Sequence, residues 1–534
     1  MVSRGNSLFG YGWAFHRDLE IKKAYVEVCV QSENTTYQLP ATIGGFRKDV
    51  AKIYPNNYRA LYSGFVVYGG WKGKKLNSAK LICIGENGQT YSAKIAVKSL
   101  DSSPLLGKSV NSRFLLYKIL FRRFWSLLQQ GNLKALSEKV SRYLKKAPSN
   151  VNNVLERIVS IWQEQQCPKT MLLIDHDLGG GANTYRAKVI EKELEKGNMV
   201  ILYTYHVLLL EHVVEVYVKD KKDRFSVNIA SIIQLPNHIN FSEIFYNTGV
   251  SFERPEDLPV FMSTLSESHQ IPITLTVNDY FMICPSQFLL NNDGKYCDIP
   301  SLEECKRCLP QNSQGFISLF EQKDIVLWRK RWKRVIEQAQ RIICFSNSSA
   351  RLLQKAYPEL EIKDKIYIKP HDVSPVTKAP NIKLDRELHI GIVGHINVHK
   401  GALVIKELSE YIAQKGLPIK ITVFGTIEAA CHPKVVHVLG SYKLEELSSL
   451  IESSGANVFF MPSICPETFS FVVHELINMD LPLVCFNLGA QAERVGNYKK
   501  GLILPVDITT PDIIECLNNF YQSMRNQYLK EKYE

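Results

Sequence analysis

The sequence has no long uninterrupted hydrophobic run. A membrane-spanning helix needs about 18 consecutive apolar residues, and the longest candidate among the 534 residues, 200–216, contains Glu211 and two histidines. The first 19 residues include Arg4, His16, Arg17 and Asp18 and have no apolar core, so they do not resemble a secretory signal. We therefore expect a cytoplasmic protein.

The sequence also has no tract of a single residue type. Hydrophobic residues make up 45% and charged residues 22% of the chain, which excludes disordered, collagen-like and coiled-coil proteins. A chain of this length predicts three or four domains of about 100–200 residues each. Eight of the 12 cysteines are scattered among apolar neighbours, as is typical of reduced, buried thiols.

Positive charge is concentrated in one segment. Of the net charge of +12, residues 103–165 contribute +8, because this segment has eleven basic and three acidic residues. Within it, apolar residues recur at helical spacing from Leu115 to Leu128, with Lys118, Arg122 and Arg123 between them. Such a helix suits an anionic membrane surface or packs on another domain with its charges solvated. No aromatic platform or zinc-finger spacing accompanies the charge, so we expect no nucleic acid partner.

The hydrophobic pattern divides the chain into four parts. Short alternating runs separated by Gly, Asn and Pro turns predict a small β-sandwich in residues 1–102. Residues 103–165 form the basic helical connector, whose helices break at Gly131 and Pro148. Strands and helices then alternate in two doubly wound α/β domains, 166–380 and 381–534. The fold class is therefore α/β, with two Rossmann-like domains facing a cleft.

Individual elements of the two α/β domains can be read from the same pattern. In the first domain we expect strands at 171–175 and 199–203, joined by a turn at 179–181 and a helix over 182–196. In the second domain strands are predicted at 388–393, 419–424, 457–460 and 483–486. Such sheets bind ligands at the carboxyl ends of their strands, so the loops there are the candidate sites.

The loop that opens the second α/β domain, 391–402, has the composition of an anion site. Gly394 lets the backbone leave the strand sharply, and Lys400 stands at the start of the helix that begins near Ala402. Lys400 and the free N–H groups of that helix predict a phosphate site. A solvated lysine at a helix start is an equally good interpretation.

A second loop of this domain places two carboxylates eight residues apart. Glu467 ends the loop after the strand at 457–460, and Glu475 follows on nearly the same side of the predicted helix. An arbitrary pair of this kind would be a helix N-terminal charge and a surface residue. Here apolar residues surround Glu475, which favours a ligand or partner for its carboxylate.

These motifs resemble those of a known family. The run 466–475, followed by the segment 481–484, Gly489 and 493–494, resembles the Glu-x7-Glu region of glycosyltransferase family 4, which comprises retaining enzymes of the GT-B fold. His-Lys-Gly at 399–401 resembles the phosphate loop of the same family. The similarity covers about residues 168–525 and is greatest to bacterial transferases that build O-antigen, capsule and other surface polysaccharides, including lipopolysaccharide.

The resemblance implies roles for the residues of the donor side. Glu475 would bind the ribose of a nucleotide-diphosphate sugar, and Glu467 with the backbone near Thr468, Phe469 and Ser470 would bind the sugar. Lys400 would neutralise the leaving diphosphate, so that catalysis requires no cofactor or metal.

The chain departs from the family's pattern at two places. His395 stands next to Gly394 where the family usually has Arg, which makes phosphate binding depend on a group that titrates near neutral pH. Asn278 stands where relatives often have His, which leaves Asp279 as a candidate catalytic residue on the acceptor side. Capping of the following loop is an equally good interpretation of Asp279.

A glycine loop in the first α/β domain has its counterpart in the same family. The segment 175–185 includes Gly180 and Gly181 and resembles the loop that closes against the donor. No Gly-Lys-Ser/Thr follows and the order Gly-x-Gly-x-x-Gly is absent, which excludes a Walker A loop and a dinucleotide fingerprint. A tight strand-to-helix turn is the simpler interpretation.

Four cysteines lie close together in the sequence. Cys284, Cys297, Cys305 and Cys308 fall within 25 residues and end in a Cys-x2-Cys pair, a composition that suits a structural zinc ion. The other two spacings are unusual for zinc sites, and reduced thiols without a metal are an equal alternative.

Together these features predict a glycosyltransferase. We expect transfer of a hexosyl or deoxyhexosyl group from a nucleotide-diphosphate donor to a growing, lipid-linked surface polysaccharide, with retention of configuration. The basic segment would hold the protein peripherally at the inner face of the plasma membrane. The alternative, motivated by Asn278 and His395, is a noncatalytic glycan-binding or scaffold protein on the same fold.

Overall fold

The structure is a computed structural model. It describes residues 1–30, 36–45, 47–71, 76–100, 154–219, 221–312, 314, 323–373, 379–384 and 386–533. The predicted basic helix at 115–128 and most of the connector therefore lie outside the described residues. Within the described part of the chain, no helix is long and apolar enough to cross a membrane.

The N-terminal domain is a β domain, as predicted, but its strands form one sheet. They pair in the order β7-β6-β3-β4-β5-β2-β1-β8, and only the pairing of β1 with β8 is parallel. The strands are β1 (Val2–Arg4), β2 (Ser7–Trp13), β3 (Ile21–Val30), β4 (Thr36–Gly45), β5 (Gly64–Gly70), β6 (Leu76–Gly85), β7 (Thr90–Ile95) and β8 (Lys98–Ser99). Period-two alternation predicts one buried face per strand and does not reveal how many sheets share it. The predicted two-sheet sandwich is therefore not the arrangement found.

The first α/β domain is built on an eight-stranded sheet in the order β12-β11-β10-β9-β13-β14-β15-β16. Its strands are β9 (Thr170–Ile174), β10 (Met199–His206), β11 (Glu211–Val218), β12 (Lys221–Val227), β13 (Glu243–Tyr246), β14 (Ile273–Val277), β15 (Ala339–Cys344) and β16 (Ile366–Ile368). β9 lies between β10 and β13 and is parallel to both, so the strand order reverses there. The loops after β9 and β13 therefore meet at a topological switch point.

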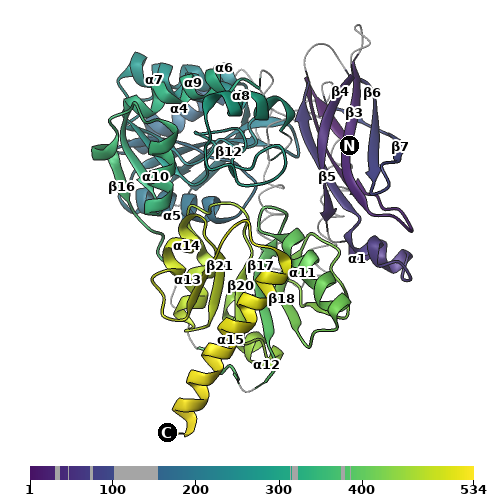
Figure 1. The fold of residues 1–534 in the computed structure, drawn as a ribbon. Helices are drawn as coiled ribbons and strands as arrows, with labels where there is room; N and C mark the ends of the chain where they lie inside the picture. The colour runs from purple at the N-terminus through teal and green to yellow at the C-terminus, as the bar shows by residue number, and fades with distance from the viewer. Residues whose placement is uncertain are drawn as a thin grey trace.

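Helices cover this sheet on both faces (Figure 1). They are α4 (Val154–Gln165), α5 (Gly181–Glu195), α6 (Ile229–Gln234), α7 (Leu258–His269), α8 (Leu302–Gln311), α9 (Ile325–Gln338) and α10 (Asn347–Ala356). α4 is the described end of the predicted connector, and its Val154, Ile158 and Ile161 are buried in the core of this domain. At this end the connector is a packed helix.

The second α/β domain has a six-stranded parallel sheet in the order β19-β18-β17-β20-β21-β22. The strands are β17 (His389–Ile396), β18 (Lys420–Ile427), β19 (Val436–Val438), β20 (Val458–Met461), β21 (Leu483–Phe486) and β22 (Gly501–Leu504). The helices are α11 (Ala402–Lys415), α12 (Leu444–Ser454), α13 (Phe471–Asn478), α14 (Gly489–Val495) and α15 (Thr510–Tyr533). The switch point lies between β17 and β20, so the loops after these two strands are adjacent.

The β domain contacts both α/β domains. Figure 1 shows it standing beside them, with α1 (Lys48–Ile53) near the second domain. The hydroxyl of Tyr68 donates a 2.8 Å hydrogen bond to the carbonyl of Ser251 in the first α/β domain. Lys406 on α11 of the second domain forms a 2.5 Å ion pair with Glu20. The β domain thus bridges the two α/β domains.

Candidate functional site

The loop after β20 is held between two glycines whose backbones have positive φ. Gly401 has φ of 86°, and a Cβ there would lie 2.0 Å from the carbonyl oxygen of Pro462. Gly489 has φ of 56°, and a Cβ there would lie 2.5 Å from the backbone nitrogen of Glu467. The Glu467 N–H also donates to Oε1 of Gln491 at 3.0 Å. Only glycine allows the three loops to approach this closely.

This packing brings Lys400 and Glu467 together. Nζ of Lys400 lies 3.9 Å from Oε1 of Glu467, and the two side chains are 35% and 11% exposed. The Ser463 hydroxyl donates to the same carboxylate oxygen at 2.8 Å. The two residues come from the ends of neighbouring strands β17 and β20, as the sequence predicted for a site at this edge. The pair presents a cation and a carboxylate to the space above the sheet.

Glu475 lies on α13 (Phe471–Asn478). Burial raises the pKa of this carboxyl, and the described residues donate no hydrogen bond to it. Helix α13 begins at Phe471, four residues after Glu467. The prediction that the two glutamates share a helix side is therefore wrong, because Glu467 lies in the preceding loop and is placed by Gly489 instead.

The residues between the glutamates face the first α/β domain. Thr468 donates from Oγ1 to the backbone carbonyl of Asn278 at 2.9 Å. The Phe469 ring stacks on His474 at 4.4 Å and meets His371 edge-on at 4.8 Å. The Ser470 side chain is buried, and its hydroxyl is without a hydrogen-bond partner in the described structure. An unsatisfied buried hydroxyl at this position could bond a ligand.

Gly394 and His395 lie near the carboxyl end of strand β17. Gly394 has φ of 113°, and a Cβ at Gly425 on β18 would lie 2.0 Å from its carbonyl oxygen. His395 is exposed, with Nε2 3.1 Å from Oε1 of Glu428 and Nδ1 beside the hydroxyl of Thr426. The imidazole predicted to serve phosphate is thus paired with a carboxylate that would compete with an anion.

At the switch point of the first α/β domain, Asp175 is the centre of a buried polar network. It follows β9 directly, and its Oδ2 lies 3.1 Å from Nη1 of Arg186 and accepts from the amide of Asn183 at 3.0 Å. Burial raises the pKa of Asp175 to about 6, although Arg186 and Asn247 oppose the rise. Burial and the neighbouring guanidinium lower the pKa of His176 to about 4, which keeps this imidazole neutral.

The glycine loop begins α5 beside this network. Gly179 and Gly180 have φ of 90° and 85°, which explains two of the three glycines as a turn requirement. A Cβ at Gly181 would lie 3.1 Å from the ring of Phe471 in the other domain. Gly181 is therefore where the glycine loop approaches the donor-side loop.

Asp279 uses both of its carboxylate oxygens within the fold. Oδ1 accepts the Phe281 N–H at 2.8 Å, and Oδ2 accepts the hydroxyl of Thr248. Burial raises the pKa of Asp279 to about 6. These contacts match loop capping, the alternative that the sequence left open. Asn278 donates from its amide to Oδ1 of Asn247 at 2.5 Å and thereby joins the strand ends of β13 and β14.

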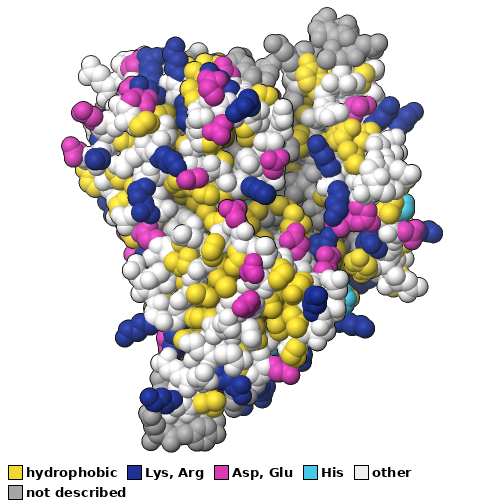
Figure 2. Space-filling view, viewed as in Figure 1, with side chains coloured by type: hydrophobic (Ala, Val, Ile, Leu, Met, Phe, Trp, Pro, Cys, Tyr) yellow, Lys and Arg dark blue, Asp and Glu magenta, His cyan; other side chains and the backbone are white. Residues whose placement is uncertain are grey.

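The two α/β domains meet through these loops. Besides the bond from Thr468 to Asn278, the ring of Phe288 stacks on His399 at 3.7 Å. Glu493 on α14 accepts the backbone N–H of Ser348 at 2.9 Å, at the start of α10. In Figure 2 hydrophobic side chains gather where the two domains meet. The loops expected to line a cleft are therefore in direct contact at these points.

The four clustered cysteines do not form a metal-binding group. Among the described residues, no three His, Cys, Asp or Glu side chains are arranged to hold a metal ion. Burial raises the pKa of Cys297 to about 11 and also raises that of Cys305. Cys305 Sγ contacts the carbonyl oxygen of Pro300 at 3.9 Å, and Cys308 Sγ accepts from the amide of Asn312 at 3.5 Å. The structural zinc ion therefore stays a prediction.

The donor-side loop, the glycine loop and the loop after β14 thus meet between the two domains. Sequence reasoning missed Arg186, Asn183 and Asn247. These residues hold Asp175 in place at the end of β9 in the first α/β domain. The available signal was Asp175 itself, an acidic residue placed directly after a fully apolar strand.

Fold and site together define a two-domain α/β protein whose polar site lies at facing strand ends. Residues 387–522 match the family described as Glycosyl transferases group 1. This match confirms the predicted resemblance to glycosyltransferases for the second α/β domain, whereas the narrower assignment to family 4 stays a prediction. No curated protein matches the chain in sequence.

Several solved glycosyltransferase structures are similar to this chain. The Anabaena protein HepE in complex with UDP-glucose is 13% identical, with a TM-score of 0.40, and the match covers 67% of this chain and 94% of that one. The lipopolysaccharide outer core galactosyltransferase WaaB is 10% identical, with a TM-score of 0.42 and coverages of 67% and 91%. WaaG, a glycosyltransferase involved in lipopolysaccharide biosynthesis, is 12% identical, with a TM-score of 0.39 and coverages of 66% and 90%.

Proposed function

We propose that this protein is a glycosyltransferase that takes a sugar from a nucleotide-diphosphate donor bound between the two α/β domains. The observation that carries the proposal is the placement of Lys400 and Glu467 at the switch point of the domain that matches the glycosyltransferase family. Ligands of doubly wound sheets bind at this position.

The diphosphate, the ribose and the sugar of the donor each have a candidate binding residue. The Lys400 ammonium would stabilise the negative charge that develops on the leaving diphosphate, a role that requires no metal ion. Glu475, half-buried and without a hydrogen-bond donor in the described structure, would accept the hydroxyls of the ribose. The unsatisfied hydroxyl of Ser470 and the carboxylate of Glu467 would hold the sugar.

On the acceptor side, we propose that Asp279 positions the loop after β14 and does not transfer a proton. Its two oxygens already accept hydrogen bonds from Phe281 and Thr248. The buried network of Asp175, Arg186 and Asn247 would set the shape of the acceptor side next to it.

The narrower proposal rests on the sequence resemblance. It comprises a retaining reaction, a hexose or deoxyhexose such as rhamnose, and a lipid-linked polysaccharide acceptor of the O-antigen or capsule type. Peripheral attachment to the inner face of the plasma membrane would follow from the basic segment 103–165, of which only 154–165 lies in the described residues.

The test is donor binding followed by donor turnover. A panel of nucleotide sugars is screened for an increase in melting temperature, and the best ligand is then assayed for hydrolysis and transfer. We expect stabilisation by one class of donor in the wild type, and its loss in Lys400→Ala and Glu475→Gln. The exposed Glu452, changed to Gln, is the matched control and should behave as wild type.

A noncatalytic glycan-binding protein is the second candidate, and the pairing of His395 with Glu428 favours it. It predicts stabilisation by glycans without stabilisation by any nucleotide sugar. Failure of every donor in the screen would therefore reject the transferase and leave this alternative.

A further inference from the structure

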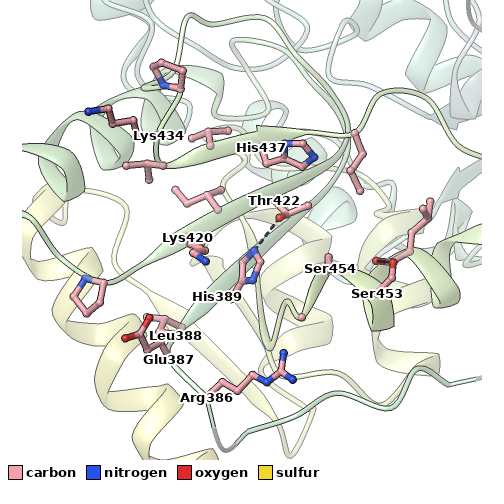
Figure 3. Close-up of a pocket in the computed structure, with 18 residues that line it drawn as sticks. Arg386, Glu387, Leu388, His389, Lys420, Thr422, Lys434, His437, Ser453 and Ser454 are labelled. Atoms are coloured by element: carbon pink, nitrogen blue, oxygen red, sulfur yellow. Dashed lines mark hydrogen bonds between the residues drawn. The ribbon is translucent and has the colours of Figure 1, made fainter.

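A second polar site lies at the opposite end of the donor-domain sheet. There a pocket of about 550 Å³ opens at the amino ends of β17 and β18, beside β19 and the last turn of α12. Figure 3 shows His389 and Thr422, joined by a hydrogen bond, among the polar residues that line it. A volume of this size is typical of small-molecule sites.

The polar lining residues share one face of the sheet. His389 on β17 is the register partner of Lys420 on β18, and Thr422 is the register partner of His437 on β19. Lys420 and Thr422 are two residues apart and therefore point to the same side. The 2.8 Å contact between Nε2 of His389 and Oγ1 of Thr422 places the imidazole on that side as well.

Positive charge dominates this pocket. Arg386, Lys420 and Lys434 line it together with a single acidic residue, Glu387. Within the described residues, no ion pair is formed by any of these three cations. Burial, followed by the charge of Lys420, lowers the pKa of His389 to about 4, so this imidazole is neutral near pH 7.

Gly455 shapes the floor between two of these groups. It ends α12 with φ of 78°, and a Cβ there would lie 3.7 Å from Nη1 of Arg386 and 3.9 Å from Nδ1 of His389. The guanidinium and the imidazole thus converge on the same small residue. Ser453 and Ser454 add hydroxyl groups, and apolar residues such as Pro418 and Leu439 complete the wall.

We propose that this pocket binds a phosphate monoester, with Arg386 and Lys420 on the phosphate and the hydroxyl groups on the rest of the ligand. Three cations from separate segments line the pocket without an ion pair in the described residues, which favours a multiply charged anion. The site is distinct from the donor site, because His389 begins β17 and His395 lies near its other end, roughly 20 Å away at about 3.3 Å per residue.

Two probes carry this chemistry from different sources. Glucose 6-phosphate is a free phosphate monoester, and vesicles containing phosphatidic acid present the same group on a membrane. Binding to the full chain is measured by calorimetry for the first probe and by sedimentation for the second. Glucose 6-phosphate binding identifies a soluble ligand, whereas binding to vesicles alone identifies a lipid headgroup, and either result supports the pocket.

Variants locate the binding. Arg386→Ser combined with Lys420→Ser should weaken binding at least tenfold, and the melting temperature shows whether this variant is folded. Lys415→Ser combined with Lys499→Ser removes the same charge from exposed positions outside the pocket and should have no effect. Lys400→Ala should also retain binding, which separates this pocket from the donor site.

The NMR resonances of the His389 ring provide a second measurement of binding on the wild-type chain. A bound phosphate should shift the ring resonances of His389, assigned by comparison with His389→Gln, and should raise its pKa. The proposal is overturned if neither probe binds at millimolar concentration, if the control pair loses as much affinity as the pocket pair, or if the His389 resonances do not move.

Discussion

At the scale of single residues, two glycines carry the geometry of the donor-side loop. Gly401 and Gly489 have positive φ and lie against the backbone of the loop after β20. A Cβ at Gly401 would lie 2.0 Å from the carbonyl oxygen of Pro462, and a Cβ at Gly489 would lie 2.5 Å from the backbone nitrogen of Glu467. Since Lys400 precedes Gly401 directly, the position of its ammonium depends on a residue without a side chain. The placement of the Lys400 ammonium thus depends on the backbone conformation of Gly401.

We expect Gly401→Ala to be strongly destabilising. The new Cβ would collide with the carbonyl oxygen of Pro462, which is backbone and cannot move aside, so the free energy of unfolding should fall by about 2–4 kcal/mol. Gly416→Ala is the control, because Gly416 also has positive φ, 61°, but has no atom within 4 Å of a Cβ. This control should cost about 1 kcal/mol. Urea denaturation of both variants measures the difference, and equal losses would contradict the role given to Pro462.

The second residue prediction concerns Asp279. In Asp279→Asn the amide oxygen still accepts the Phe281 N–H, so loop capping is preserved. Turnover should therefore stay within about threefold of wild type, whereas loss of a general base would lower it by about 100-fold or more. Steady-state kinetics with the donor found in the screen decides between positioning and proton transfer. Asp279→Ala removes the cap as well and should lower stability.

At the scale of elements, the sequence pattern predicted the parallel strands of the two α/β domains well, whereas the antiparallel strands β11 and β12 of the first sheet were not predicted. The strand expected at 483–486 is β21 with the same bounds, and the helix expected at 182–196 is α5 shifted by one residue. Buried parallel strands read as short apolar runs, which makes them easy to recognise.

The sequence predicted the residues of the second α/β domain at the candidate site, but not the polar network of the first. Glu467 and Lys400 lie in loops and Glu475 lies on α13, at spacings that resemble those of the family, and the structure places Lys400 and Glu467 3.9 Å apart. Asp175 and Arg186 are eleven residues apart, and their ion pair depends on how the glycine loop folds back on α5. Contacts between the domains, such as that of Phe288 with His399, depend on docking and leave no signal in local periodicity.

The prediction for elements concerns the start of α10. Glu493, on α14 of the other domain, accepts the N–H groups of Asn347 and Ser348 at 3.3 Å and 2.9 Å. Glu493→Ala should lower the free energy of unfolding by about 2 kcal/mol, because two helix N–H groups lose a charged acceptor. Hydrogen exchange at these two amides should accelerate more than elsewhere in α10. The exposed Glu452→Ala is the control, and an unchanged exchange rate in Glu493→Ala would contradict this contact.

At the scale of the whole molecule, the excess positive charge and the ion pairs between the domains belong to different parts of the chain. The surplus of +8 lies in residues 103–165, whereas the β domain is attached to the α/β domains by specific pairs such as Arg4 with Glu211 at 3.3 Å and Lys406 with Glu20. Burial raises the pKa of Glu20, but the hydrogen bonds and charges of Lys406 and Lys22 together lower it by more, so the pKa of this carboxyl is below its usual value. The bridge is therefore complete at neutral pH.

Neutral buried histidines, after β9 and at the contacts between the domains, make the fold sensitive to acid. Burial lowers the pKa of His176 and His371 to about 4 and that of His399 to about 3. The unfolded chain, with histidine pKa near 6.5, binds these protons first. Stability contributed by these groups is therefore fully present above pH 6.5 and is lost as pH falls toward 4. The raised pKa values of Asp175 and Asp279 act in the opposite direction over pH 4–6, so they offset part of the loss.

We expect His399→Phe to show how much His399 contributes to the loss of stability at low pH. The phenyl ring can keep the stack on Phe288 but cannot bind a proton, so this variant should lose less stability between pH 8 and pH 5 than wild type does. With the folded pKa at about 3, the difference amounts to about 2 kcal/mol. Urea denaturation at the two pH values measures it, and the exposed His238→Phe is the control. Identical pH dependence in wild type and His399→Phe would mean that the imidazole of His399 is not held neutral by the contact between the domains.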